Sequence, residues 1–312
     1  MRIVVALLLI IAAAYVGTNY TPHHASDPAA PFVPLFSHLM PAPLVSNPAG
    51  VELGEMPQYL VPPITVPLAD TFDAAPELPG TQFVFTNLQL FQVLAVLLIF
   101  VCFSGVPRYL RTGKGDSLSK IFAGFAMWVR DEMVYAVMGK EVGKKFLPYI
   151  LSLFFFILFM NVIGLFPGTA TATASVFVTA GLALLTLVVM VFGGMIAQGP
   201  ITYWKTLVPH VPWFVYPIML VVELVGILVK PFALMIRLFA NMTGGHMVVL
   251  SFMGLLFLMA HGMGQVAYAG SLAVVPFAVF IMIIESFVAL LQAYVFTMLS
   301  ILFIQASIHP EH

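Results

Sequence analysis

The sequence predicts an all-α polytopic membrane protein with about five transmembrane helices. Of its 312 residues, 61% are hydrophobic and only 8% are charged, and the mean hydropathy is +1.05. A soluble domain carries about 25% charged residues, so this balance indicates a chain that is embedded in lipid. The net charge of −1 at pH 7 excludes a broad basic surface for nucleic acid. The single cysteine, Cys102, lies in an apolar run and has no partner for an internal disulfide.

Residues 1–17 resemble a secretory signal peptide. Arg2 precedes an apolar run at 3–16, which is too short to cross about 30 Å of hydrocarbon as a helix. Small residues at 12–14 complete the pattern. An uncleaved membrane anchor is the alternative, and in both cases we expect the next segment to be exported.

Residues 18–80 form a proline-rich segment without lysine or arginine but with several aspartates and glutamates. This composition predicts an extended, irregular structure. His23, His24 and His38 could bind a metal, but they lack the ordered spacing of a metal site. We therefore expect neither a metal nor a cofactor.

Residues 81–312 are predicted to form the membrane domain. Apolar runs predict helices near 84–106, 147–166, 176–197, 215–259 and 271–307. The last two are too long to cross a bilayer upright, so we expect a long, tilted hairpin.

The segment 107–146 contains eight of the twelve basic residues of the chain. The positive-inside rule places this segment in the cytoplasm and the N-terminus outside. Five crossings then leave the C-terminus in the cytoplasm. Within this segment, residues 119–139 are expected to form an amphipathic helix at the membrane surface.

Ionisable side chains inside the last two predicted helices are the candidate functional groups. The fourth helix contains Glu223, Lys230 and Arg237, and the fifth contains Glu285. An arginine at the bilayer centre costs at least about 2.5–3.5 kcal/mol on insertion scales, which favours a functional role for Arg237. Lys230 is interpreted as structural, because a lysine can extend its amine along the helix to the interface.

Helical geometry relates the residues of the fourth helix. Glu223 and Arg237 are fourteen residues apart, so they share nearly one face at a separation of about 21 Å. Asn241 lies one turn beyond Arg237 on that face. His246 lies about 13 Å beyond Arg237, on the opposite side of the helix.

Topology gives these groups their depth in the membrane. It predicts Glu223 near the cytoplasm, Arg237 in the middle, and His246 with Glu285 toward the outside. Gln292 follows Glu285 by seven residues and shares its face. This order suits a proton path that a fixed positive charge divides into two.

Simpler interpretations remain open. His246 and Glu285 could satisfy each other as a buried pair, and Glu223 could be solvated at the membrane interface. Gly244 and Gly245 are expected to permit close helix contact.

The stretch KPFALMIRLFANMTGGH closely resembles subunit a of F-type ATP synthases. The family pattern is Arg-Leu-x-x-Asn on the penultimate helix, with an acidic residue fourteen positions earlier. Arg237, Leu238, Asn241 and Glu223 match it.

Two further motifs carry the resemblance. Gln292 matches a glutamine on the family's last helix, seven residues after the titratable Glu285. The stretch FILFMNVIGLFPG, at 156–168, is similar to the family's second-span signature, in which Asn161 would face the outer channel.

The resemblance implies a non-catalytic proton-channel subunit of a rotary ATP synthase, held between the subunit c ring and the peripheral stalk (subunit b). Protons would enter past Asn161, His246 and Glu285, with Asn241 as a further candidate on this path, load a carboxylate on subunit c, and leave past Glu223. A bacterial inner membrane is the expected location, with the mitochondrial inner membrane as the alternative. The runner-up function is a stand-alone proton-coupled transporter, which would usually show an inverted repeat that we do not find.

Overall fold

The computed structural model describes residues 2–20, 64–65, 82–83, 87–165, 172–207, 212, 214–263 and 266–309. The helices are α1 (Arg2–Tyr20), α3 (Asn87–Phe103), α4 (Val106–Thr112), α5 (Ser117–Trp128), the π-helix η2 (Val129–Tyr135), α6 (Ala136–Gly164), the 3₁₀ helix η3 (Ala172–Ala174), α7 (Val176–Gln198), α8 (Pro200–Thr206), α9 (Tyr216–Met263) and α10 (Val266–Ile308). The described β-structure is one short antiparallel pair, β1 (Ile64–Thr65) with β2 (Gln82–Phe83).

The predicted all-α membrane fold is confirmed. Among the described residues, five helical segments are long and apolar enough to cross a membrane: Leu88–Thr112, Ser117–Gly164, Val176–Gln198, Tyr216–Phe252 and Val274–Ile308. The chain is therefore a multi-pass membrane protein.

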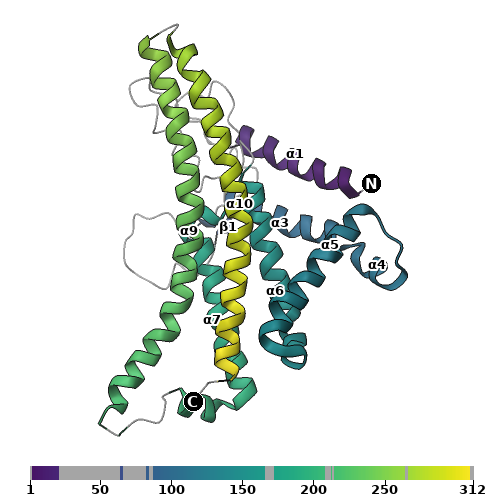
Figure 1. The fold of residues 1–312 in the computed structure, drawn as a ribbon, viewed down its shortest axis with the longest axis vertical. Helices are drawn as coiled ribbons and strands as arrows, with labels where there is room; N and C mark the ends of the chain where they lie inside the picture. Colours follow the sequence, from purple (N-terminus) through teal and green to yellow (C-terminus); the bar gives the residue numbers. More distant parts are fainter. Residues whose placement is uncertain are drawn as a thin grey trace.

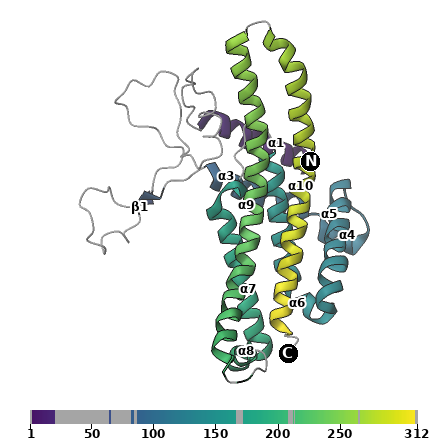
Figure 2. The same ribbon diagram turned by 60° about the vertical axis from the view of Figure 1, so that its left-hand side comes forward.

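Helices α9 and α10 form a long hairpin that defines the longest dimension of the molecule (Figures 1 and 2). They contain 48 and 43 residues. At about 1.5 Å per residue, each is roughly twice as long as a 30 Å hydrocarbon layer is thick. Such helices either incline in a bilayer or extend beyond it, so their predicted length is confirmed and their tilt stays a prediction.

The hairpin packs against α6 and α7. Leu234 and Leu238 of α9, Phe296 and Ile301 of α10, and Phe154 of α6 are buried in one shared core. Lipid is as apolar as these side chains, so close packing and interhelical hydrogen bonds hold such a core together. One such bond joins the hydroxyls of Tyr149 and Thr186 at 3.0 Å, between α6 and α7.

The helix boundaries agree with the sequence prediction to different degrees. Helix α7 matches the predicted 176–197 within one residue. The predicted 84–106 is divided into α3 and α4, and Gly105 precedes α4.

The predicted start of the second crossing, at 147, is wrong. Helix α6 begins at Ala136 and includes a basic turn with Lys140, Lys144 and Lys145. Because this turn is basic, it does not belong to an apolar run, although its backbone is helical. Gly139, at φ 70° and ψ 170°, interrupts the helix geometry near its start.

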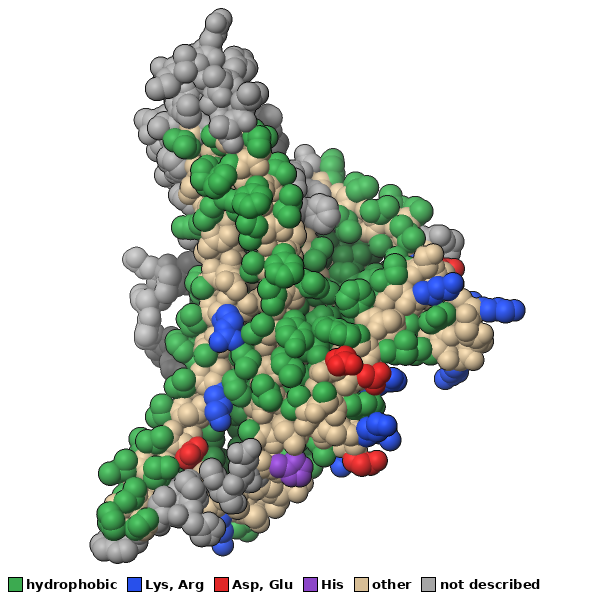
Figure 3. All heavy atoms as spheres, in the orientation of Figure 1, with side chains coloured by type: hydrophobic (Ala, Val, Ile, Leu, Met, Phe, Trp, Pro, Cys, Tyr) green, Lys and Arg blue, Asp and Glu red, His purple; other side chains and the backbone are tan. Residues whose placement is uncertain are grey.

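The predicted amphipathic helix at 119–139 is divided among three elements. Helix α5 is followed directly by η2 and then by the first residues of α6. Ser119 and Ala123 face inward, whereas Lys120 and Ile121 are exposed. Figure 3 shows acidic and basic side chains gathered on this side of the molecule, whereas most of the visible α9–α10 surface is apolar.

Helix α1 extends four residues beyond the apolar run at 3–16 and packs along α3. Arg2 donates a hydrogen bond to the Ser119 hydroxyl at 3.0 Å and lies 3.8 Å from an Asp116 oxygen. Arg2 therefore lies beside the basic segment, on the side predicted to be cytoplasmic. The side of the membrane on which the N-terminus lies stays a prediction. His23, His24 and His38, with most of 18–80, fall outside the described residues.

Candidate functional site

The structure brings His246 of α9 and Glu285 of α10 together. His246 Nε2 lies 3.6 Å from Glu285 Oε1. The glutamate side chain is only 6% exposed and the histidine side chain 17%. A carboxylate so deeply buried is stable only beside a partner that can share a proton or compensate its charge. The two groups predicted to share one depth thus lie side by side, and their part in a proton path stays a prediction.

Gly245 makes this approach sterically allowed. A Cβ atom added at Gly245 would meet Glu285 Oε1 at 2.6 Å and its carboxyl carbon at 2.8 Å. At Gly244 an added Cβ would find no atom within 4 Å. The expected close-contact role therefore belongs to Gly245, and Gly244 faces open space.

A second interhelical contact lies further along the hairpin. The Asn241 amide donates a hydrogen bond to Gln292 Oε1 at 2.8 Å. Gln292 is 3% exposed, and its Nε2 has no hydrogen-bond partner among the described residues. Since Gln292 follows Glu285 by two turns, the two contacts form a polar seam between α9 and α10.

Asn161 is fully buried on α6. Its amide donates to the Ala289 carbonyl at 3.1 Å, and its Oδ1 accepts from the Thr173 hydroxyl at 2.8 Å. Ala289 lies one helical turn from Glu285 on α10. Asn161 thus links α6 and η3 to the helix that holds Glu285, and its hydrogen bonds go to neither Glu285 nor His246.

Arg237 lies on the exposed surface of α9. Its neighbours Leu234 and Leu238 are buried against the core. The arginine forms no hydrogen bond or ion pair with any residue that the structure describes. In Figure 3 the charged side chains along α9 stand on an otherwise apolar face. A guanidinium on such a face is costly unless an anionic partner or water compensates its charge.

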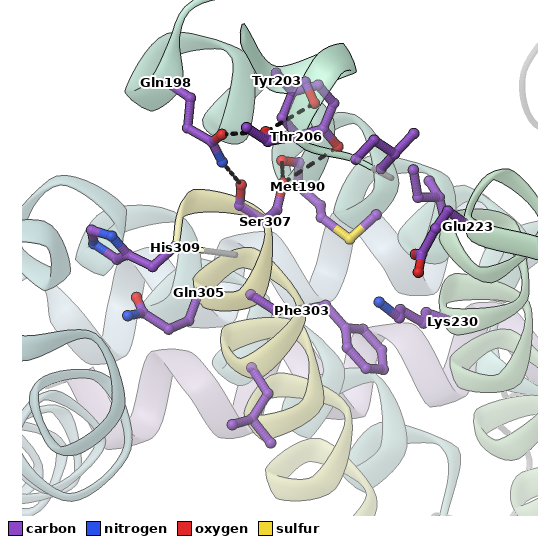
Figure 4. A pocket seen from close by; sticks show the side chains of 14 residues that line it. Met190, Gln198, Tyr203, Thr206, Glu223, Lys230, Phe303, Gln305, Ser307 and His309 are labelled. Atoms are coloured by element: carbon purple, nitrogen blue, oxygen red, sulfur yellow. Dashed lines mark hydrogen bonds between the residues drawn. The ribbon is translucent and has the colours of Figure 1, made fainter. Parts of the chain in front are cut away.

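Glu223 lines a polar pocket at the other end of the hairpin, with a volume of about 530 Å³. Lys230 lies on the same wall, and its Nζ is 5.9 Å from the centre of the Phe303 ring. Figure 4 shows Phe303 of α10 turned toward Lys230, whereas Gln305 and His309, which also line the pocket, lie on the other side of α10. The Oε1 atom of Gln305 is buried without a hydrogen-bond partner among the described residues.

The remaining polar residues of this pocket could not be recognised from the sequence. They come from α7, α8 and the end of α10: Gln198, Tyr203, Thr206 and Ser307. The only sequence signal was a group of polar residues directly after the apolar run of α7. That group has the composition of an ordinary loop.

The hairpin therefore contains two polar regions at different positions along its length, with an exposed arginine between them along α9. Residues 89–305 match the protein family described as ATP synthase A chain. This match covers more than half of the chain. The chain belongs to the ATP synthase A chain family.

Named relatives of this family come from several bacteria. The chain is 45% identical to ATP synthase subunit a of Myxococcus xanthus over 207 residues, 66% of this chain and 64% of the relative. It is 39% identical to ATP synthase subunit a 2 of Chlorobaculum tepidum over 212 residues, 68% of this chain and 58% of the relative. With ATP synthase subunit a of Maricaulis maris, it is 34% identical over 243 residues, 75% of this chain and 92% of the relative. The chain thus spans less than two thirds of the first two relatives.

Proposed function

We propose that this chain is the proton-translocating stator subunit of an F-type ATP synthase. The observation that carries the proposal is the arrangement on the α9–α10 hairpin. A buried His246–Glu285 pair and a polar pocket at Glu223 lie on either side of Arg237, which is exposed and has no ion pair with the described residues. Family membership leaves the stand-alone transporter without support.

The outer region loads protons. Protons enter from the outside near Asn161 and pass through the His246–Glu285 pair, whose nitrogen and oxygen are 3.6 Å apart. The Asn241–Gln292 bond holds the two helices in register beside this pair. From Glu285 the proton neutralises a carboxylate on the passing subunit c. A neutral carboxyl group can then move through lipid, where a charged one would be costly.

Arg237 separates loading from release. An opposite charge at about 4 Å, in an effective dielectric near 20, stabilises the ionised rotor carboxylate by about 4 kcal/mol. The neutral rotor site therefore loses its proton as it approaches Arg237. The fixed positive charge also repels a proton that would pass directly between the two regions.

The inner region releases protons. Glu223 accepts the proton, and the polar pocket conducts it to the cytoplasm past Gln305 and His309. The driving force is about 2.3 kcal/mol per charge for each 100 mV of membrane potential.

The chain itself carries no catalytic role in this proposal, because ATP is made in the soluble head. Its partners are the subunit c ring, the peripheral stalk (subunit b), the bilayer and protons. Its location is the bacterial inner membrane, with segment 18–80 outside and the C-terminus in the cytoplasm.

Affinity purification of the tagged chain from membranes tests this function. We expect a ring of small hairpin subunits, a peripheral stalk and a soluble ATPase to copurify, and the complex to acidify vesicles when ATP is added. A chain that moves protons after purification without a ring would support the stand-alone transporter instead.

A further inference from the structure

The last turn of α10 is held by a side chain from α7. Gln198 Nε2 donates to the Ser307 carbonyl at 2.8 Å and to the Ile308 carbonyl at 3.3 Å. The final carbonyls of a helix lack partners within the helix, so a donor from elsewhere must satisfy them. Gln198 performs this role from more than a hundred residues away in the sequence.

The Gln198 amide is itself oriented. The Thr206 hydroxyl donates to Gln198 Oε1 at 2.8 Å, which points the amide nitrogen at α10. The Ser307 hydroxyl donates in turn to the Met190 carbonyl at 2.8 Å. Figure 4 shows Gln198, Thr206 and Ser307 meeting at one end of the pocket.

Gly194 provides the space for this attachment. A Cβ atom at Gly194 would lie 2.9 Å from the Ser307 carbonyl oxygen, and it would also collide with the Tyr203 ring. Helices α7 and α10 therefore approach each other so closely because position 194 has no side chain.

The turn that Gln198 holds is also a wall of the inner pocket. Gln305 and Ser307 of α10, and His309 directly after it, line the same pocket as Glu223 and Lys230 of α9. The position of this turn thus sets the distance across the pocket.

We propose that Gln198 is a positioning residue of the inner proton route. By donating to the last carbonyls of α10, it fixes the end of the helix that carries Gln305 and is followed by His309, both of which line the same pocket as Glu223. The role of Gln198 in proton release rests on the proposed function of the chain, whereas its attachment of α10 does not.

Two substitutions at position 198 distinguish the effect of the hydrogen-bond donor from the effect of side-chain size. Gln198→Glu keeps the shape but presents an oxygen to carbonyls that already carry negative partial charge. Gln198→Lys keeps a donor, and a cation is favourable at a helix C-terminus. Glutamate should therefore release the last turn, and lysine should retain it.

The test measures access to the pocket and pumping in the assembled complex. In a Cys102→Ser background, Gln305→Cys is labelled with a small impermeant thiol reagent from the cytoplasmic side of inverted vesicles. Gln198→Glu should raise the labelling rate about tenfold, as expected for the loss of one hydrogen bond and its replacement by repulsion. Gln198→Lys should stay within about threefold of the parent. Thr206→Val, which removes only the orienting hydroxyl, is a milder variant and should shift the rate in the same direction.

ATP-driven acidification, measured with Gln305 intact, should fall several-fold in Gln198→Glu and recover in Gln198→Lys. Unchanged labelling in both Gln198→Glu and Thr206→Val would overturn the attachment. Faster labelling of Gln305→Cys in Gln198→Glu, together with full pumping by Gln198→Glu, would overturn the role of Gln198 in the proton route. An equal change at Lys114→Cys, which is predicted on the same side of the membrane and lies outside the pocket, would show a general change in access and would also overturn the inference. Failure of the proposed function would appear instead as coupled pumping by Arg237→Ala.

Discussion

A methyl group added at Gly245 should disturb the His246–Glu285 pair, whereas the same change at Gly244 should not. Gly245→Ala places a Cβ atom 2.6 Å from Glu285 Oε1, and Gly244→Ala meets nothing within 4 Å. Both changes exchange glycine for alanine inside one helix, so both gain about 1 kcal/mol of helix propensity. The difference between the two variants therefore reports the contact with Glu285.

The displacement follows from the geometry. Ordinary van der Waals contact begins at 3.4 Å, so the carboxylate must move by at least 3.4 − 2.6 = 0.8 Å. If it moved directly away from His246, the 3.6 Å separation would grow to 3.6 + 0.8 = 4.4 Å. Misplacement of a reacting group by about 1 Å can cost up to 10²-fold in rate, so we expect Gly245→Ala to slow proton pumping by between about tenfold and 10²-fold.

The assay is the initial rate of ATP-driven acidification of inverted vesicles, normalised to the amount of assembled complex. Gly244→Ala should pump faster than Gly245→Ala, since its Cβ meets no atom of the described chain within 4 Å. Equal rates in the two alanine variants would refute the close contact between Gly245 and Glu285.

Two further predictions concern the outer pair and the orientation. Glu285→Gln should slow ATP-driven pumping strongly while the complex stays assembled, because an amide cannot exchange a proton as a carboxyl does. Normal pumping would mean that the His246–Glu285 pair has only a structural role. In a Cys102→Ser background, Lys114→Cys should react with an impermeant maleimide only from the cytoplasmic side and Gly50→Cys only from outside, and the opposite labelling would reverse the orientation of the whole hairpin.

Relations within one helix could be predicted from the sequence, because the helical period is fixed. The shared face of Glu285 and Gln292 follows from a spacing of seven residues. Contacts between helices depend on the offset of α9 against α10, which the spacing of residues along either helix does not determine. The Asn241–Gln292 hydrogen bond is such a contact. The His246–Glu285 pair could be anticipated only from predicted depth and family resemblance.

Other features left no recognisable local signal. Gly244 and Gly245 are adjacent and chemically identical, and only the packing of α10 shows which one lies against a side chain. The start of α6 was missed because its first turns are basic, and an apolar criterion ends where charge begins. Gln198 finds its partners 109 and 110 residues further along the chain, so a polar residue at the end of α7 gave no indication of its role.

The central claim is that Arg237 couples the two polar regions to the rotor, and its replacement by alanine tests this directly. Arg237 is exposed and forms no ion pair with the described residues, so Arg237→Ala removes a charge without breaking a contact within them. Arg237→Lys keeps a charge but loses the planar fork that reaches a carboxylate in two places, and it should also fail or nearly fail. The deciding measurement is ATP-driven acidification of inverted vesicles carrying Arg237→Ala, with immunodetection of the assembled complex. The account predicts an assembled complex that does not pump; pumping near the rate of the unsubstituted protein would contradict it.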